Sequence, residues 1–111
     1  MGQVWSADEL RGRHGAAGGR LYDEFLRVGS MSAGLYRLRA GGADPQGPHR
    51  EDEVYVVLAG RATFETADAR TEVGPGAVIF VGKGEVHRFV DIAEDLDVVV
   101  LFAPPESSGD G

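Results

Sequence analysis

Short runs of β-branched and aromatic residues recur along most of the chain, and glycines and prolines stand between them. This arrangement is typical of short strands joined by tight turns. We predict strands over residues 20–28, 34–39, 53–58, 61–66, 70–73, 77–81, 86–92 and 96–103. No segment between residues 12 and 104 keeps a 3.6-residue apolar period, so a βαβ unit and a parallel sheet are excluded. We therefore expect an antiparallel, all-β fold.

Two segments contain residues that favour chain reversals. Residues 58–61 (LAGR) are typical of a hairpin turn, and residues 74–76 (GPG) predict a second sharp turn. Residues 54–58 and 98–102 are apolar at every position, which indicates strands that are covered on both faces. A closed or double sheet is the architecture that covers strands in this way.

The two ends of the chain differ from its middle. Ser6 and Glu9 fit a capping box and predict a short N-terminal helix that ends by Gly12. Residues 104–111 are proline, serine, glycine and acidic residues with nothing to bury, so we expect a disordered acidic tail. A single domain over residues 1–103 would precede this tail.

Composition narrows the classes of function. A chain of 111 residues forms one domain. It has no cysteine, which excludes disulfide scaffolds, thiolate zinc sites and cysteine nucleophiles. The glycine-rich residues 12–19 match neither a dinucleotide-binding nor a Walker pattern, so no organic cofactor is predicted.

Charge and hydropathy exclude two classes of partner. The 18 acidic residues outnumber the 11 basic ones, and the formal charge of -7 repels nucleic acid and anionic membrane surfaces. No apolar run approaches the ~18 residues that span a bilayer. The N-terminus lacks the basic and apolar regions of a secretory signal, so we predict a cytoplasmic location.

Three residues form a candidate metal site. His49 and Glu53 are four residues apart at the start of a predicted strand, where alternation places both side chains on one face. His87 lies at the start of another strand. Two imidazoles and one carboxylate form the set that holds Fe(II) with open positions, and the same set also holds Zn(II), Mn(II) or Ni(II). The alternative is a hydrogen-bonded polar cluster in a metal-free barrel.

The spacing around these residues resembles the two signature motifs of the cupins, G(x)5HxH(x)3-4E(x)6G and G(x)5PxG(x)2H(x)3N. The matching positions are Gly41, His49, Glu53 and Gly60 in the first motif, and Gly76, Gly84 and His87 in the second. The resemblance implies a jelly-roll barrel that holds one divalent metal ion per chain, either iron, zinc, manganese or nickel. It assigns His49, Glu53 and His87 as metal ligands.

This chain departs from the motifs at three positions. Gly47 stands in place of the first histidine, Gly82 in place of the proline and Asp91 in place of the asparagine. One of the four expected ligands is therefore missing. Gln46 is adjacent and offers an amide oxygen, but on a regular strand it would face the other way, so a water is the expected substitute.

The candidate pocket residues are Gln46, Tyr55 and Phe89, the last two because they share a face with Glu53 and His87. We predict a small metalloenzyme that acts on a small polar organic substrate, with a dioxygenase slightly preferred over an isomerase or lyase and no catalytic residue assigned. A non-catalytic binding or sensing module and a structural domain remain open. The apolar residues within 20–28 and the resemblance together predict a homodimer.

Overall fold

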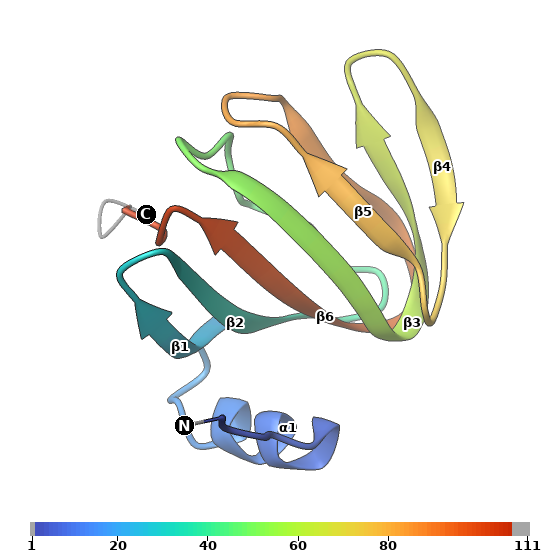
Figure 1. The fold of residues 1–111 in the computed structure, drawn as a ribbon. Helices are drawn as coiled ribbons and strands as arrows, with labels where there is room; N and C mark the ends of the chain where they lie inside the picture. The colour runs from blue at the N-terminus through green and yellow to red at the C-terminus, as the bar shows by residue number, and fades with distance from the viewer. Residues whose placement is uncertain (1, 108–111) are drawn as a thin grey trace.

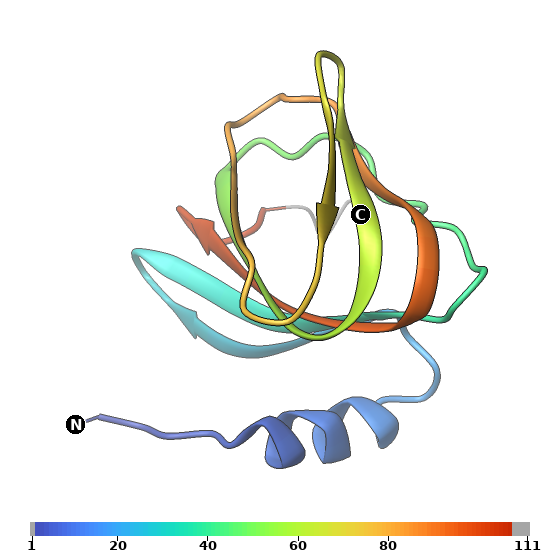
Figure 2. The same ribbon diagram turned by 90° about the vertical axis from the view of Figure 1, so that its right-hand side faces the viewer.

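An antiparallel six-stranded sheet curls into a barrel and accounts for most of the chain (Figures 1 and 2). The computed structural model describes residues 2–107. Its elements are α1 (Ala7–Gly15), β1 (Tyr22–Val28), β2 (Met31–Leu38), β3 (Asp52–Thr66), β4 (Arg70–Val73), β5 (Val78–Val81) and β6 (His87–Ala103). The strand order is β1-β2-β6-β3-β4, and β5 also pairs with β3. The predicted all-β class with a short N-terminal helix is confirmed.

Two of the strands are about twice as long as predicted. β3 spans both predicted strands on either side of residues 58–61, so the predicted hairpin turn there is wrong. Gly60 instead lies in a bulged stretch of β3, with φ of 94° and its Cα hydrogen facing Asp95 of β6. Glycine permits either a turn or a bulge, and pairing with β6 on both sides of Gly60 selects the bulge.

The turn predicted at residues 74–76 is present and joins β4 to β5. The Ala77 N–H donates to the Gly74 carbonyl at 3.0 Å, and the Gly76 N–H donates to the Val57 carbonyl at 2.8 Å. These bonds place β5 beside the first half of β3.

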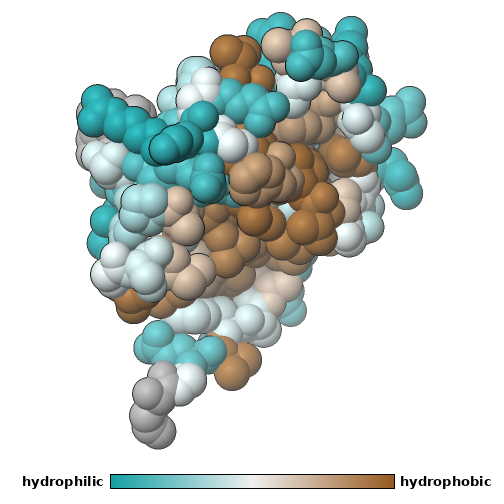
Figure 3. Space-filling model, turned by 45° about the horizontal axis from the view of Figure 1, so that its top comes forward, coloured by the Kyte–Doolittle hydropathy of each residue, from teal (hydrophilic) through white to brown (hydrophobic). Residues whose placement is uncertain are grey.

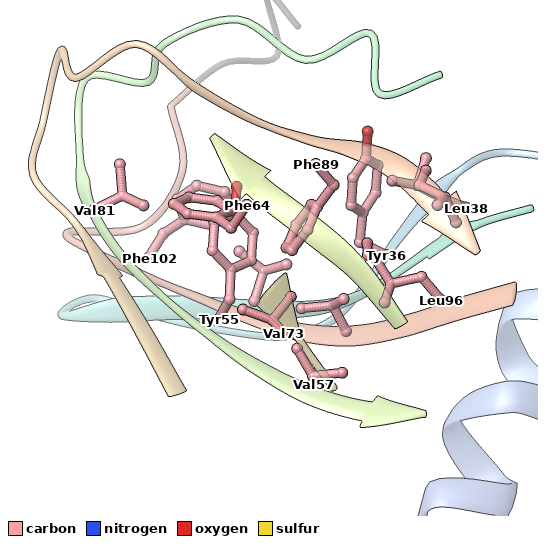
Figure 4. Packing of buried hydrophobic residues seen from close by; sticks show 14 residues of the cluster. Tyr36, Leu38, Tyr55, Val57, Phe64, Val73, Val81, Phe89, Leu96 and Phe102 are labelled. Carbon is pink, nitrogen blue, oxygen red and sulfur yellow. The ribbon is translucent and has the colours of Figure 1, made fainter. Parts of the chain in front are cut away.

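The core lies inside the barrel, where alternate residues of β3 and β6 point (Figure 4). Tyr55 and Phe89 meet edge to face with ring centroids 5.2 Å apart, and Phe64 meets Phe89 at 5.1 Å. Other members of this cluster include Tyr36, Leu38, Val57, Val73, Val81, Leu96, Val98 and Phe102. The interior is thus filled at its centre, and polar side chains occupy only one end.

The N-terminal helix covers the outside of β1 and β2 (Figure 1). Its capping box is present: the Glu9 N–H donates to Ser6 Oγ at 3.0 Å, and the Ser6 N–H donates to Glu9 Oε1 at 2.9 Å. The helix continues past Gly12 to Gly15, because glycine weakens a helix without ending it. Within residues 2–107, no helix is long and apolar enough to cross a membrane.

The start of the expected tail lies against the barrel. The Glu106 N–H donates to Ser32 Oγ at 2.9 Å, and the Ser107 hydroxyl donates to the buried carboxylate of Glu51 at 2.6 Å. Ser32 on β2 and Glu51 in the loop before β3 thus hold Glu106 and Ser107 against the barrel by hydrogen bonds, although these two residues have little apolar surface to bury. Residues 108–111 of the expected tail lie outside the described residues.

Candidate metal centre

His49, Glu53 and His87 come together at one end of the barrel, as the sequence predicts. Each offers one ligand atom, and these atoms lie within 4.8 Å of one another. Glu53 points inward from the start of β3, His87 is the first residue of β6, and His49 lies in the loop that leads into β3. Donors on one first-row ion lie about 3–4 Å apart, so small side-chain rotations close this set around an ion.

The Glu53 carboxylate is buried, with His87 Nε2 2.9 Å from its Oε1. Only 1% of Glu53 is exposed, and neither carboxylate oxygen accepts a hydrogen bond of good geometry. An unpaired buried anion costs several kcal/mol, on the order of the penalty for any isolated ion in a protein interior. A cation between Glu53 and its neighbours removes this cost, so the site fits a divalent metal.

The orientation of His87 supports the same conclusion. His87 Nδ1 lies 2.7 Å from the carbonyl oxygen of Glu85, which only accepts, so Nδ1 carries the hydrogen. The neutral ring then has its lone pair on Nε2, which lies 2.9 Å from Glu53 Oε1. Two atoms with lone pairs therefore face each other at this distance, an arrangement that a proton or a metal ion between them would stabilise.

The pKa of His87 reflects this arrangement. Burial alone lowers the pKa of the imidazole, but the Glu53 carboxylate and the Glu85 carbonyl outweigh burial and raise it above the ordinary value. A proton taken up by His87 would lie between Nε2 and Glu53 Oε1, where a metal ion would otherwise bind.

Tyr55 lies within the site, and Phe89 lies beneath it. The Tyr55 hydroxyl is 3.0 Å from His87 Nε2, and its ring packs against Phe89. Burial, together with the charges of Glu53 and Asp44, raises the pKa of Tyr55 well above its ordinary range. The phenol therefore keeps its proton at neutral pH.

Gln46 faces the site, contrary to the expectation that it would face away. Its Oε1 lies 3.2 Å from His49 Nε2, and its Nε2 donates to the Tyr55 hydroxyl at 2.8 Å. The expectation assumed a strand, but residues 43–50 form none. Pro45 and Pro48 lack the N–H that a sheet ladder needs, so the loop is free to turn Gln46 inward.

The sequence analysis missed Asp44, which organises this loop. Its Oδ2 accepts from the Phe89 N–H at 2.9 Å and from Gln46 Nε2 at 3.1 Å. Its Oδ1 accepts from the Tyr36 hydroxyl at 2.5 Å. The Asp44-Pro45 pair is a recognisable turn signal, but nothing in the local sequence shows that the carboxylate reaches β6.

Glu106 was also missed. Its Oε2 lies 3.8 Å from His49 Nδ1, on the side of the ring opposite Gln46. Carboxylates in this position commonly orient metal-binding imidazoles. The composition of residues 104–111 predicted a tail without contacts, so the sequence analysis did not include Glu106 in the site.

A cavity of about 310 Å³ opens beside the site. Its lining includes Gln46, Pro48, Thr66, Val86, His87 and Arg88. The ring of His87 is buried behind this lining, so the cavity lies beside the candidate ligands and does not open onto them.

Comparison with known proteins identifies the family. Residues 34–104, well over half of the chain, match the cupin domain family. The chain belongs to the cupins. The predicted jelly-roll barrel is thereby confirmed, and the two motifs found in the sequence are those of this family.

This cupin resembles proteins of several bacteria. It is 48% identical over 105 residues to an uncharacterized protein of Streptomyces coelicolor, covering 95% of this chain and 99% of the other. An uncharacterized Klebsiella pneumoniae protein with a double-stranded β-helix domain superposes with a TM-score of 0.76 at 18% identity, covering 94% of this chain and 91% of that one. The DMSP lyase DddQ of Ruegeria pomeroyi superposes with a TM-score of 0.67 at 23% identity, covering 74% of this cupin and 46% of the lyase.

Proposed function

We propose that this cupin binds one divalent metal ion through His49, Glu53 and His87 and uses it to convert a small polar organic molecule. The observation that carries the proposal is the 2.9 Å distance between two potential metal ligands, His87 Nε2 and Glu53 Oε1, in a buried site. A purely structural polar cluster would supply donors to Glu53, and the described residues supply none of good geometry.

The residues around the ligands support catalysis at this site. A bound divalent ion supplies Lewis acidity and, if the ion is iron, a site for oxygen chemistry. Tyr55 holds its proton beside His87 and is placed to donate it to a substrate oxygen. Phe64 and Phe89 pack below Tyr55 and exclude water from that side. The adjoining open cavity of about 310 Å³ has room for a small molecule.

Oxygen-dependent chemistry is the first candidate, because two histidines and one carboxylate are the ligand set of non-haem Fe(II) oxygenases. A redox-neutral lyase or isomerase is the second, supported by the structural likeness to a DMSP lyase. Both need the same protein ligands, and they differ in their requirement for O₂.

The first experiment measures metal. Protein purified without chelator should contain about one iron, zinc, manganese or nickel per chain by elemental analysis. A His49→Ala/His87→Ala variant should contain only traces, whereas His14→Ala, which changes a histidine outside the site, should match the wild type. Equal metal in the double variant and the wild type would contradict the proposal.

The second experiment assigns the chemistry. Protein loaded anaerobically with Fe(II) is screened with small phenolic, thiol and dicarbonyl compounds while oxygen uptake and substrate loss are followed. Oxygen-coupled substrate loss is expected, with a fall of about 10²-fold or more in Tyr55→Phe from the lost proton donor. Turnover with Zn(II) under nitrogen would select the lyase or isomerase, and tight binding without turnover would select a non-catalytic binding module.

We also propose a homodimer, through a surface other than the one expected. Phe25 of β1 packs edge to face against Trp5 of its own chain, with ring centroids 4.9 Å apart, so this part of β1 is already covered. The outer face of β6, β3 and β5 is apolar instead (Figure 3). Strand register places its side chains in two adjacent rows, Leu101–Val54–Phe80 and Val99–Val56–Val78.

Val78 and Phe80 on this face are 70% and 66% exposed. A second copy related by a twofold axis would cover the same rows on both chains at once. Light scattering at micromolar concentration should give twice the 11.8 kDa chain mass, and Val78→Asp/Phe80→Glu should give a monomer. A monomeric wild type would refute the dimer.

A further inference from the structure

We infer that Gln46 Oε1 is the fourth protein ligand of the metal ion, in the coordination position that Gly47 leaves without a side chain. The inference rests on the metal site proposed above and replaces the water expected at this position. It is carried by the direction of one amide group, by two distances between donor atoms, and by the loop that holds Gln46.

The direction of the Gln46 amide follows from its partners. One end of the amide lies 3.1 Å from Asp44 Oδ2 and 2.8 Å from the Tyr55 hydroxyl. An ionised carboxylate only accepts hydrogen bonds, so the atom facing Asp44 is the NH₂ nitrogen. The carbonyl oxygen must then be the atom that faces His49, and it is the end of the amide able to bind a metal.

The distances between donor atoms match adjacent ligands of one ion. Gln46 Oε1 lies 3.2 Å from His49 Nε2, and Glu53 Oε1 lies 2.9 Å from His87 Nε2. Two donors about 2.1 Å from one ion and at right angles to each other are about 3 Å apart. Both pairs fit this spacing.

The surroundings of His49 allow it to present a lone pair to the same point. In the metal-free chain, Nε2 can donate its hydrogen to Gln46 Oε1. When Nε2 binds a metal, the hydrogen moves to Nδ1, which faces Glu106 Oε2 at 3.8 Å; a small side-chain rotation must shorten this distance to make a hydrogen bond. Both tautomers therefore have an oxygen on the correct side of the ring, and the metal-bound one leaves Gln46 Oε1 free to bind the ion.

The loop holds Gln46 in place without a strand. Asp44 is fixed by the Tyr36 hydroxyl and by the Phe89 N–H, and in turn accepts from both the backbone and the side chain of Gln46. A Cβ at Gly47 would meet nothing within 4 Å, so no neighbouring group competes for that side of the loop. These hydrogen bonds give the Gln46 side chain its orientation before a metal ion binds.

This ligand set has a chemical consequence. A neutral amide oxygen in place of a neutral imidazole leaves the net charge of the site unchanged. Oxygen is, however, a harder ligand atom than an imidazole nitrogen. Oxygen donors suit Mn(II) and similar hard ions, whereas imidazole suits zinc, copper, iron and nickel. Gln46 therefore shifts the preference of the site toward manganese.

Mn(II) is the probe for the test, because the relaxation of water protons reports how many waters the ion holds. The full chain should bind one Mn(II), and Gln46→Ala should bind one Mn(II) with about tenfold lower affinity and one additional exchangeable water. Gln3→Ala, which removes the chain's other glutamine at an exposed position, should match the wild type in both values. Near-UV circular dichroism confirms that each variant is folded.

The outcomes separate this inference from the metal site itself. Weaker binding without an additional water would make Gln46 a positioning residue and overturn the inference, as would unchanged binding. Gln46→Glu should restore the wild-type water number, because it retains an oxygen ligand; a water number equal to that of Gln46→Ala would also overturn it. Failure of the wild type to bind Mn(II), or binding that survives His87→Ala, would instead refute the proposed metal site.

Discussion

The guanidinium of Arg37 on β2 and the carboxylate of Asp97 on β6 meet at 2.7 Å across two paired strands of the barrel. Asp97 Oδ2 also accepts from Arg11 of α1 at 2.7 Å. One buried carboxylate therefore ties the helix to two strands of the barrel.

Asp97→Ala should destabilise the chain by about 2 kcal/mol, because it leaves two guanidinium groups, on side chains 31% and 36% exposed, without their shared partner. Asp8→Ala is the matched control: Asp8 pairs with the same Arg11, but its side chain is 95% exposed. Asp8→Ala should lower the free energy of unfolding by less than about 0.5 kcal/mol. Urea unfolding measures both values, and equal costs would contradict this account.

Metal should stabilise the folded chain. A ligand that binds only the folded state at 100 times its Kd adds about 2.7 kcal/mol to the free energy of unfolding. For a domain of this size that raises the Tm by roughly 10 °C or more. Thermal unfolding with chelator and with added Mn(II) measures the shift, which should disappear in Glu53→Gln and persist in Glu72→Gln, an exposed residue on β4. A shift in Glu53→Gln would mean that the ion binds elsewhere.

Two glycine substitutions should have opposite effects. Gly60→Ala should cost more than about 2 kcal/mol, since φ is 94° and the new Cβ would lie 2.3 Å from the Asp95 carbonyl oxygen. Gly12→Ala should stabilise the chain by about 0.5–1 kcal/mol, because it lies within α1 and its Cβ would meet nothing within 4 Å. Chemical denaturation of both variants tests the assignment of residue 60 to a bulge; a tolerated Gly60→Ala would contradict it.

The capping box should make the free energy of unfolding depend on pH. Hydrogen bonds from the backbone and side chain of Ser6 lower the pKa of Glu9 below its ordinary value of 4.5. A lowered carboxyl pKa gives stability that is present above 4.5 and is lost as the pH falls through the lowered value. Glu9→Ala should therefore be less stable than the wild type at pH 7, with the difference shrinking below about pH 4. Denaturation at pH 7, 5 and 3.5 provides the test, and a constant difference would contradict the capping role.

Several features of this cupin follow from the sequence alone, because neighbouring residues determine them. Alternation of apolar residues predicts strands and the inward face of β3, which places Glu53 and Tyr55 correctly. The spacing of the two motifs identifies His49, Glu53 and His87, and Ser6 with Glu9 predicts the helix start. Each of these depends on backbone geometry within a few residues.

The tertiary structure decided the features that depend on distant partners. Gly60 lies in a bulge because β6 pairs with β3 on both sides of it. Gln46 turns into the site because Asp44, two residues before it, is held by the N–H of Phe89, 45 residues away. Glu106 reaches His49 because Ser32 on β2 and Glu51 before β3 hold its segment. Hydrogen bonds in loops have no period along the chain, so only the folded barrel shows which groups they join.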